Sequence, residues 1–483
     1  MGALSHLEPK SVFRFFDEIT QIPHGSGNID RISDYLVDFA KDRNLFYIQD
    51  DVKNVIIVKE ASKGYEEEPA VIIQGHMDMV AVKKPDCSID MKSQGLQVAV
   101  DGDYIYAQGT SLGGDDGIAV AYALALLDAD DIKHPRLEVV ITVDEETGMD
   151  GARAIDLSML QGKRLLNIDS EEEGILLTSC AGGARVKCEL QTMVSKTEGT
   201  LLEIELGGLL GGHSGAEIHK ERGNSNYLMG RVLYGLTQEN AIGLVSLEGG
   251  LADNAIPRRT KAVVVTSNDT VDYVQTYIKN IEQDLKTELA GKDDDIYLNC
   301  MRFAKQEVVC ATTEDTKRVA SLLIAMPNGV QAMSTDMPGL VETSLNLGIL
   351  EYEDGKLLAE FSVRSSVESA KHALIDKMRA ITSLAGGKAE VSGDYPGWKY
   401  RKDSPLREKM IAVYEKMYGE TPKIEAIHAG LECGILGSKI EDLDCISFGP
   451  DMKDIHTTEE VLSISSTQRV WQYLLQVLET KDR

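Results

Sequence analysis

Five short segments of the 483-residue sequence concentrate imidazole and carboxylate side chains. Each has an ordinary explanation when taken alone, because Asp-Asp-Gly commonly forms a turn with a helix cap and a Glu pair is commonly a solvated surface pair. Together they supply two imidazoles and at least four carboxylates, with little basic charge nearby. The segments are Gly75-His76-Met77-Asp78, Gly113-Gly114-Asp115-Asp116-Gly117, Asp144-Glu145-Glu146-Thr147-Gly148, Asp169-Ser170 and the region of His456.

The chemistry that these segments share is that of a site for divalent cations. If they meet, so many carboxylates cannot all stay ionised without a compensating positive charge. Histidine with Asp or Glu, and without Cys, suits Zn²⁺, with Co²⁺ and Mn²⁺ as alternatives. A bridging carboxylate with one His and one acid on each side favours two ions about 3.5–4 Å apart. We therefore expect two divalent metal ions, with zinc as the first choice.

The adjacent pair Glu145-Glu146 indicates a division of roles. Neighbouring side chains on an extended chain point in opposite directions, so one carboxylate can ligate a metal ion while the other faces the water bound there. That free carboxylate is then placed to act as a general base. The pattern alone does not say which residue does which.

Short apolar runs rich in Val and Ile precede these segments and are typical of buried strands. They alternate with helical stretches, which predicts an α/β fold with a mostly parallel, mixed sheet and helices on both faces. All five segments follow the carboxyl ends of predicted strands, the edge at which open α/β sheets bind ligands. The predicted strands are 54–60, 70–75, 136–144, 164–169 and 444–449, and the predicted helices are 9–23, 30–43, 117–130 and 405–418.

The pattern changes near residue 187, where alternating apolar residues replace the continuous runs. Since 483 residues exceed one ordinary core, we expect two domains, the second being an α+β insertion. Within the insertion we predict alternating strands in 185–206 and 258–267, and helices at 224–239 and 271–290.

The insertion interrupts the candidate metal centre, because it lies between Asp169 and His456. A domain inserted between ligands is well placed to act as a lid that excludes water when it closes. We therefore predict a discontinuous catalytic domain made from 1–187 and 388–483, and a lid domain at 188–387.

Composition excludes several classes of partner. The formal net charge of −28 argues against nucleic acid, because an acidic chain repels phosphate backbones. No apolar run reaches the roughly 18 residues of a membrane span, and the N-terminus lacks the pattern of a signal peptide. The seven cysteines form no CxxC pair, which is typical of free thiols in a reducing compartment. We predict a cytoplasmic protein that binds neither nucleic acid nor membrane.

The order and spacing of the motifs resemble those of the M20 family of di-zinc peptidases. Within that family the chain is similar to the aminoacyl-histidine dipeptidase branch, nearly from end to end. All these motifs in this order indicate the family far more specifically than any single motif does. The motifs are IPHGSGN (22–28), GHMDMV (75–80), GGDDG (113–117), DEETG (144–148), NIDSEEEG (167–174), GLLGGHSGAEIHKERGN (208–224), GGLADNAIPR (249–258), GLVETSLNLG (339–348), FSVRSS (361–366), GDYPGWK (393–399), HAGLECG (428–434) and DIHTTEE (454–460).

The resemblance implies a di-zinc centre held by five residues. It implies His76 and Asp169 as ligands of one zinc ion, and Glu146 and His456 as ligands of the other. Asp115 matches the carboxylate that bridges the two ions.

Three neighbours of these ligands have other implied roles. Asp78 matches the acid that orients His76 through a hydrogen bond. Glu145 matches the general base. Asp116 is the variable neighbour in the Asp-Asp-Gly turn, and we assign it only a capping role.

The resemblance also implies substrate-binding residues in the later part of the chain. His213 matches a lid histidine that stabilises the oxyanion, either within its own subunit or across a dimer. Asn254 and Arg364 match residues that bind the substrate carboxylate, and Gly430 lies in a stretch similar to one lining the site.

The resemblance implies a metallo-dipeptidase that hydrolyses Xaa-Xaa dipeptides, Xaa-His included, with a metal-bridged water activated by Glu145. Two alternatives stay open: an M20-type amidohydrolase acting on N-acyl amino acids or tripeptides, and a catalytically silent binding module. No expected ligand or base is missing from the sequence, which favours the enzyme. The expected partner is a small peptide substrate, and a homodimer is compatible with the resemblance.

Overall fold

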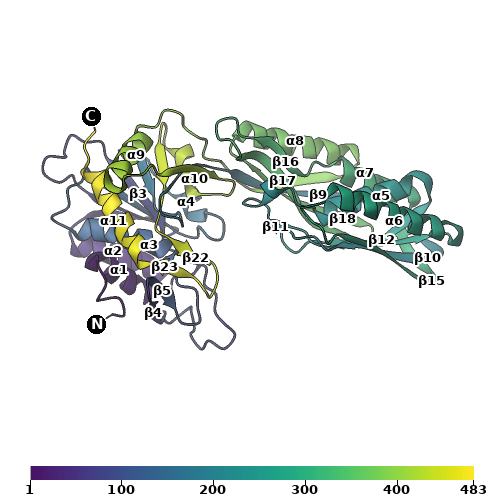
Figure 1. The fold of residues 1–483 in the computed structure, drawn as a ribbon, viewed down its shortest axis with the longest axis horizontal. Coiled ribbons are helices and arrows are strands. Elements are labelled where there is room, and N and C mark those ends of the chain that lie inside the picture. The colour runs from purple at the N-terminus through teal and green to yellow at the C-terminus, as the bar shows by residue number, and fades with distance from the viewer. Residues whose placement is uncertain (1, 483) are drawn as a thin grey trace. The chain divides into compact units, whose positions relative to one another are not determined.

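Two large sheets, each with its own hydrophobic core, divide the chain into two units (Figure 1). The computed structural model describes residues 2–482. The first unit comprises Met1–Ser179, Tyr400–Ala426 and Leu431–Arg483, and the second comprises Cys180–Lys399 and Ile427–Gly430.

The unit boundaries differ from the predicted 187/188 and 387/388. Strands β9 (Gly182–Gln191) and β19 (Lys388–Tyr395) pair with each other inside the second sheet, so both belong wholly to the second unit. The short return 427–430 also joins the second unit and carries Gly430 with it. That the second unit serves as a lid stays a prediction.

An eight-stranded sheet in the order β1-β2-β6-β3-β7-β21-β8-β20 forms the centre of the first unit. Its middle strands β6, β3, β7 and β21 run parallel, whereas β1, β2 and β8 pair antiparallel with their neighbours. Every residue of β3 and β6 is buried, as expected for parallel strands covered on both faces. The predicted α/β class with a mixed sheet is therefore confirmed. The bounds are β1 Phe46–Gln49, β2 Val55–Lys59, β3 Val71–His76, β6 Leu137–Thr142, β7 Arg164–Asn167, β8 Ile175–Cys180, β20 Lys423–Ile427 and β21 Asp444–Ser447.

Helix α3 (Gly114–Asp128) lies in the core of the first unit, with every residue up to Leu127 buried. Its Ala/Leu-rich composition leaves no polar face, which suits a helix surrounded by protein. Tyr122 stacks on Trp471 of α11 with ring centroids 5.6 Å apart, and its hydroxyl donates to the Thr467 carbonyl at 2.8 Å. These contacts fix the helix that begins at the Asp-Asp-Gly motif. The remaining bounds are α1 Lys10–Thr20, α2 Asp30–Asp42, α4 Asp150–Ala154, α9 Pro405–Tyr418, α10 Glu432–Lys439 and α11 Ile464–Glu479, with β4 Val98–Asp101, β5 Tyr104–Ala107, β22 Met452–Lys453 and β23 Val461–Ser463 in a small separate sheet.

The second unit is built on a nine-stranded sheet in which the described pairings are antiparallel. Apolar residues of its four helices pack with the sheet in one core, as the predicted α+β character requires. A two-stranded ribbon, β11 with β13, places His213 opposite Ala255. The bounds are β10 Val194–Gly207, β11 Gly212–His213, η1 Ile218–Lys220, α5 Ser225–Glu239, β12 Ile242–Gly249, β13 Ala255–Ile256, β14 Thr260–Thr266, η2 Asn268–Thr270, α6 Val271–Glu288, β15 Tyr297–Ala311, α7 Thr313–Ala325, β16 Gly329–Met333, β17 Val341–Glu353, β18 Lys356–Ser365 and α8 Glu368–Leu384.

Two further predictions concern membrane spans and cysteines, and both can be checked within residues 2–482. No helix in that range is long and apolar enough to cross a membrane. None of the seven cysteines, all within that range, forms a disulfide bond, as predicted.

Candidate metal centre and active site

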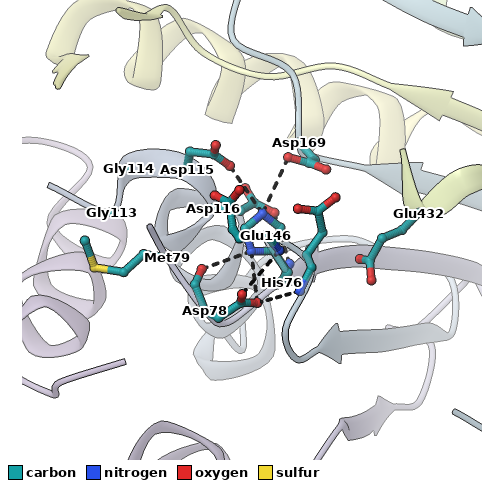
Figure 2. A network of polar contacts seen from close by, with 12 residues as sticks. His76, Asp78, Met79, Gly113, Gly114, Asp115, Asp116, Glu146, Asp169 and Glu432 are labelled. Carbon is teal, nitrogen blue, oxygen red and sulfur yellow. Dashed lines mark hydrogen bonds and ion pairs between the residues drawn. The ribbon is translucent and has the colours of Figure 1, made fainter. Parts of the chain in front are cut away.

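His76, the last residue of β3, is fully buried, and its Nε2 atom faces two carboxylates (Figure 2). His76 Nε2 lies 3.2 Å from Asp115 Oδ1 and 3.7 Å from Asp169 Oδ1. Asp169 follows β7, which runs parallel to β3, so the two strand ends share one edge of the sheet. The structure thus brings together three residues that the sequence predicts as ligands.

A second imidazole meets the same aspartate from the other side. His456 Nε2 lies 3.1 Å from Asp115 Oδ2 and 3.0 Å from Glu146 Oε1. Each carboxylate oxygen of Asp115 therefore faces a different histidine. Ligand atoms of Asp115, Glu146 and His456 lie within 4.8 Å of one another, a spacing that one metal ion could span.

Asp116 does not cap α3, which is the role that the sequence predicts for it. Its Oδ2 accepts the His76 main-chain N–H at 3.1 Å, and the side chain is fully buried. The start of α3 is capped instead by Glu460, whose carboxylate accepts the N–H groups of Gly113 at 3.0 Å and Gly114 at 2.8 Å. Ligand atoms of Asp116, His76 and Asp169 also lie within 4.8 Å of one another.

The charges of this cluster are unbalanced. Within residues 2–482, the carboxylates of Asp115, Glu146 and Asp169 form ion pairs only with histidine, and none with Lys or Arg. Burial alone would lower the pKa of His76, yet hydrogen bonds to its acidic neighbours raise it well above the usual value. Hydrogen bonds from His456 Nε2 to the carboxylates of Asp115 and Glu146 raise the pKa of His456 to about 10. A donor set that attracts protons this strongly fits divalent cations.

The Glu145 side chain differs from that of its neighbour Glu146. Its carboxylate forms no hydrogen bond with any residue of the described chain, while Glu146 contacts His456. Burial raises the pKa of Glu145 well above its usual value. Ligand atoms of Glu145, Glu146 and His76 nevertheless lie within 4.8 Å of one another, and the division of roles between the two glutamates stays a prediction.

Three basic side chains of the second unit, those of His213, Arg364 and His428, lie close to one another. A Cβ atom at Gly215 would lie 3.0 Å from His213 Cε1, 3.2 Å from Arg364 Nε and 2.5 Å from the His428 carbonyl oxygen, so only glycine fits there. Arg364 is buried, and its Nε has no hydrogen-bond partner among the described residues. Its guanidinium lies 3.5 Å from the Tyr395 hydroxyl, and no carboxylate pairs with it in residues 2–482. An anionic ligand would complete this cluster.

His213 is held in one tautomer. Its Nδ1 accepts the main-chain N–H groups of Gly215 at 3.3 Å and Ala216 at 3.0 Å, which leaves the ring proton on Nε2. Burial, with the Arg364 guanidinium nearby, lowers the pKa of His213. The neutral ring therefore presents an N–H donor.

His213 and Asn254 line one cavity of about 740 Å³ in the second unit. The Ser214 N–H donates to the Asn254 carbonyl at 2.8 Å and links their two segments. Gly430 is half-buried beside Ala429, whose carbonyl accepts the Ala181 N–H at 3.0 Å. The substrate-binding roles of Asn254 and Gly430 stay predictions.

A buried polar network that the sequence pattern does not predict lies beside the candidate metal centre. Glu432 is fully buried beside the cluster (Figure 2), and its Oε2 accepts from Gln74 Nε2 at 2.5 Å and Thr142 Oγ1 at 2.6 Å. Burial raises the pKa of Glu432 to about 7. The HAGLECG motif contains Glu432, but one acid at the start of a helix gives no spacing signal of its own.

The chain is similar to known peptidases in both sequence and structure. The family model described as "Peptidase family M20/M25/M40" matches residues 72–480. The chain is 36% identical over 484 residues to "Cytosol non-specific dipeptidase" of Escherichia coli (strain K12), covering 99% of both proteins. It matches the crystal structure of aminoacylhistidine dipeptidase from Vibrio alginolyticus with a TM-score of 0.93 and 37% identity, covering 99% of both chains. A match to aminopeptidase PepT from Bacillus cereus, with a TM-score of 0.56, 16% identity and 98% coverage of both chains, shows the fold alone.

Proposed function

The chain belongs to peptidase family M20/M25/M40, and we propose that it is a metal-dependent dipeptidase that hydrolyses free Xaa-Xaa dipeptides, Xaa-His among them. The names of its two full-length relatives support this substrate class. The observation that carries the proposal is Asp115, whose two carboxylate oxygens each face a different imidazole.

Five residues are proposed to hold two divalent ions, zinc in the first instance and cobalt or manganese otherwise. His76 and Asp169 would hold one ion, Glu146 and His456 the other, and Asp115 both. The absence of Lys or Arg partners in the described part of the cluster, and the raised pKa of both imidazoles, support this assignment. When bound, such ions polarise a peptide carbonyl and lower the pKa of water.

Glu145 is the proposed general base. Its carboxylate is next to the ligand Glu146 but forms no hydrogen bond within residues 2–482, so it is free to take a proton from the attacking water. The same carboxylate then returns a proton to the leaving amine. Breaking a peptide bond needs both transfers, and one residue at this position can perform them in sequence.

The second unit would hold the rest of the substrate. The neutral Nε2–H of His213 would donate to the developing oxyanion. Arg364, which is buried without an acidic partner in the described chain, would bind the free carboxylate together with Asn254. A required terminal carboxylate selects short peptides.

A dipeptide panel assayed with and without a chelator tests the proposal. We expect free dipeptides to be cleaved, chelation to abolish cleavage, and Zn²⁺, Co²⁺ or Mn²⁺ to restore it. Full activity in protein shown by elemental analysis to be metal-free would overturn the metal assignment. Including one tripeptide and one N-acetyl amino acid tests the substrate class, because cleavage of these alone would replace the dipeptidase proposal.

We further propose that the protein works in the cytoplasm, as the name of the Escherichia coli relative suggests for that protein and as seven cysteines outside any disulfide favour here. A homodimer stays a prediction, which the molar mass in solution decides.

A further inference from the structure

The segment 22–28, with sequence IPHGSGN, has no part in the function proposed above but lies against the metal centre. The Met79 N–H donates to the His24 carbonyl at 3.1 Å, and the Ser26 N–H donates to the Met79 carbonyl at 3.2 Å. Gly25 pairs with Met79 in an isolated parallel bridge. The segment therefore runs beside Asp78-Met79, which follow the proposed ligand His76 by two and three positions.

The Asp78 carboxylate is closer to other partners than to the imidazole that the family resemblance expects it to orient. His76 Nδ1 lies 3.0 Å from the Asp78 main-chain carbonyl but 3.5 Å from carboxylate Oδ1. Oδ1 instead accepts the Glu145 N–H at 3.0 Å, and Oδ2 accepts the Ser26 hydroxyl at 2.8 Å and the Glu146 N–H at 3.4 Å. The carbonyl thus fixes the ring, and the carboxylate fixes the main chain of the Glu pair.

A second contact ties the same segment to the residue before the Glu pair. The Gly27 N–H donates to Asp144 Oδ1 at 2.6 Å. Asp144 has a φ of 52°, a left-handed conformation that non-glycine residues adopt at a cost, while Gly27 adopts its φ of 74° freely. Three consecutive residues after β6 are therefore held, directly or through Asp78, by Ser26 and Gly27.

We infer that Ser26 is a positioning residue that acts through Asp78 to hold Glu145 and Glu146 in place. This inference rests on the proposed function, in which Glu145 is the base and Glu146 a ligand. Asp78 is buried, so loss of the Ser26 hydroxyl leaves Oδ2 with only the longer contact from the Glu146 N–H. Oδ1 keeps the Glu145 N–H, but Oδ2 is held more weakly, and the turn that the carboxylate holds loosens.

Removing the Ser26 hydroxyl should mainly lower kcat. Displacement of a reacting group by about 1 Å costs on the order of 10²-fold in rate, so a loosened Glu145 should lower kcat by about 10- to 100-fold. The hydrogen bonds of Ser26 go to Asp78 and Met79, both in the first unit, whereas the substrate carboxylate is proposed to bind in the second. KM should therefore change by less than about threefold.

Three variants test the inference with zinc at saturation. Ser26→Ala removes the donor, and Ser26→Thr restores a hydroxyl. Ser93→Ala is the matched control, because Ser93 also donates to an aspartate, Asp90 Oδ2 at 2.5 Å, in an exposed loop of the same unit. We expect low kcat for Ser26→Ala, at least partial rescue by Ser26→Thr, and wild-type kinetics for Ser93→Ala.

Hydrogen exchange of peptides covering residues 143–149 gives a readout independent of activity. We expect faster exchange in Ser26→Ala, with or without metal, because the Glu145 and Glu146 N–H groups lose a firmly held acceptor. If Ser26→Ala does not fold, Ser26→Cys, with its weaker donor, provides the same comparison.

The outcomes separate this inference from the proposed function. Wild-type protein that cleaves no dipeptide would overturn the function, while the exchange experiment would still decide the positioning role. Active wild-type protein together with unchanged kcat and unchanged exchange in Ser26→Ala would overturn the inference alone.

Discussion

His456 Nε2 lies 3.0 Å from Glu146 Oε1, although 310 positions separate the two residues in the chain. The adjacent Glu145 has no imidazole contact of this kind and no hydrogen bond from its carboxylate within residues 2–482. Two neighbouring acids of the same type are thus distinguished by one contact. That difference supports the proposed roles of Glu146 as a metal ligand and of Glu145 in proton transfer.

Replacing Glu145 should therefore have a different effect from replacing Glu146. Glu145→Gln should lower kcat by at least about 10³-fold with both metal ions retained, because general-base catalysis contributes about 10²–10⁴-fold. Glu146→Ala should lose metal from one site, since His456 keeps only Asp115 as an acidic neighbour. Steady-state kinetics with elemental analysis measures both, and the opposite pattern would reverse the assignment.

His213→Ala should lower kcat by roughly 10²–10³-fold, as expected for loss of one oxyanion donor. Metal content should not change, because His213 contacts main-chain N–H groups in the second unit and is not a proposed ligand. His219→Ala, an exposed histidine in the neighbouring η1, is the matched control. Near-normal kcat in His213→Ala would remove the residue from the mechanism.

Amidation of the substrate C-terminus should reduce kcat/KM strongly. Leaving a buried guanidinium without its anion costs about 2 kcal/mol or more, which corresponds to about 30-fold. Arg364→Met should lower kcat/KM for the free dipeptide by a similar factor and should have little further effect on the amide. Arg379→Met, at an exposed arginine that pairs with Asp376 on α8, is the control. Equal kcat/KM for a dipeptide and its amide in wild type would contradict the role of Arg364.

His428 should make the second unit less stable in mild acid. Burial, with Arg364 and His213 nearby, lowers the pKa of His428 to about 3, and the ring lies 2.7 Å from the Ser344 hydroxyl. Below the unfolded pKa of about 6.5 only the unfolded chain takes up the proton, so stability falls as pH falls from 6.5 towards 3.

Comparison with a variant isolates this contribution. Between pH 7 and pH 5 the stability of wild type relative to His428→Gln should fall by about 2 kcal/mol, measured by hydrogen exchange of peptides from the second unit. His219→Gln should keep the pH dependence of wild type. A wild-type curve parallel to that of His428→Gln would exclude a neutral, buried ring at this position.

The positions of the predicted ligands follow from rules that sequence patterns carry. Apolar runs identify β3 and β7, their parallel pairing brings both carboxyl ends to one edge, and polar residues just after a strand must meet there. The proximity of His76 and Asp169 is therefore predictable from residue type and spacing. The five expected ligands do meet in the structure, while their metal-binding roles stay proposals.

Other parts of the site depend on contacts for which the sequence has no periodic signal. Glu432 reaches Gln74 across 358 positions, and Ser26 reaches Asp78 from a glycine-rich loop with no regular spacing. The Asp-Asp-Gly pattern predicts that Asp116 caps α3, but Glu460, far along the chain, accepts those N–H groups instead. Single polar contacts between distant segments depend on packing details that residue type and spacing do not encode.

The place of β21 in the first sheet also affects the order in which the two sheets can form during synthesis. This strand lies between β7 and β8, yet it is encoded after every strand of the second sheet. Domains commonly fold as units while a chain is being synthesised. The second sheet can therefore close around its own core while the first still has a gap, and His456 emerges after β21. Under the proposed assignment of ligands, peptide hydrolysis is withheld until residue 456 has left the ribosome.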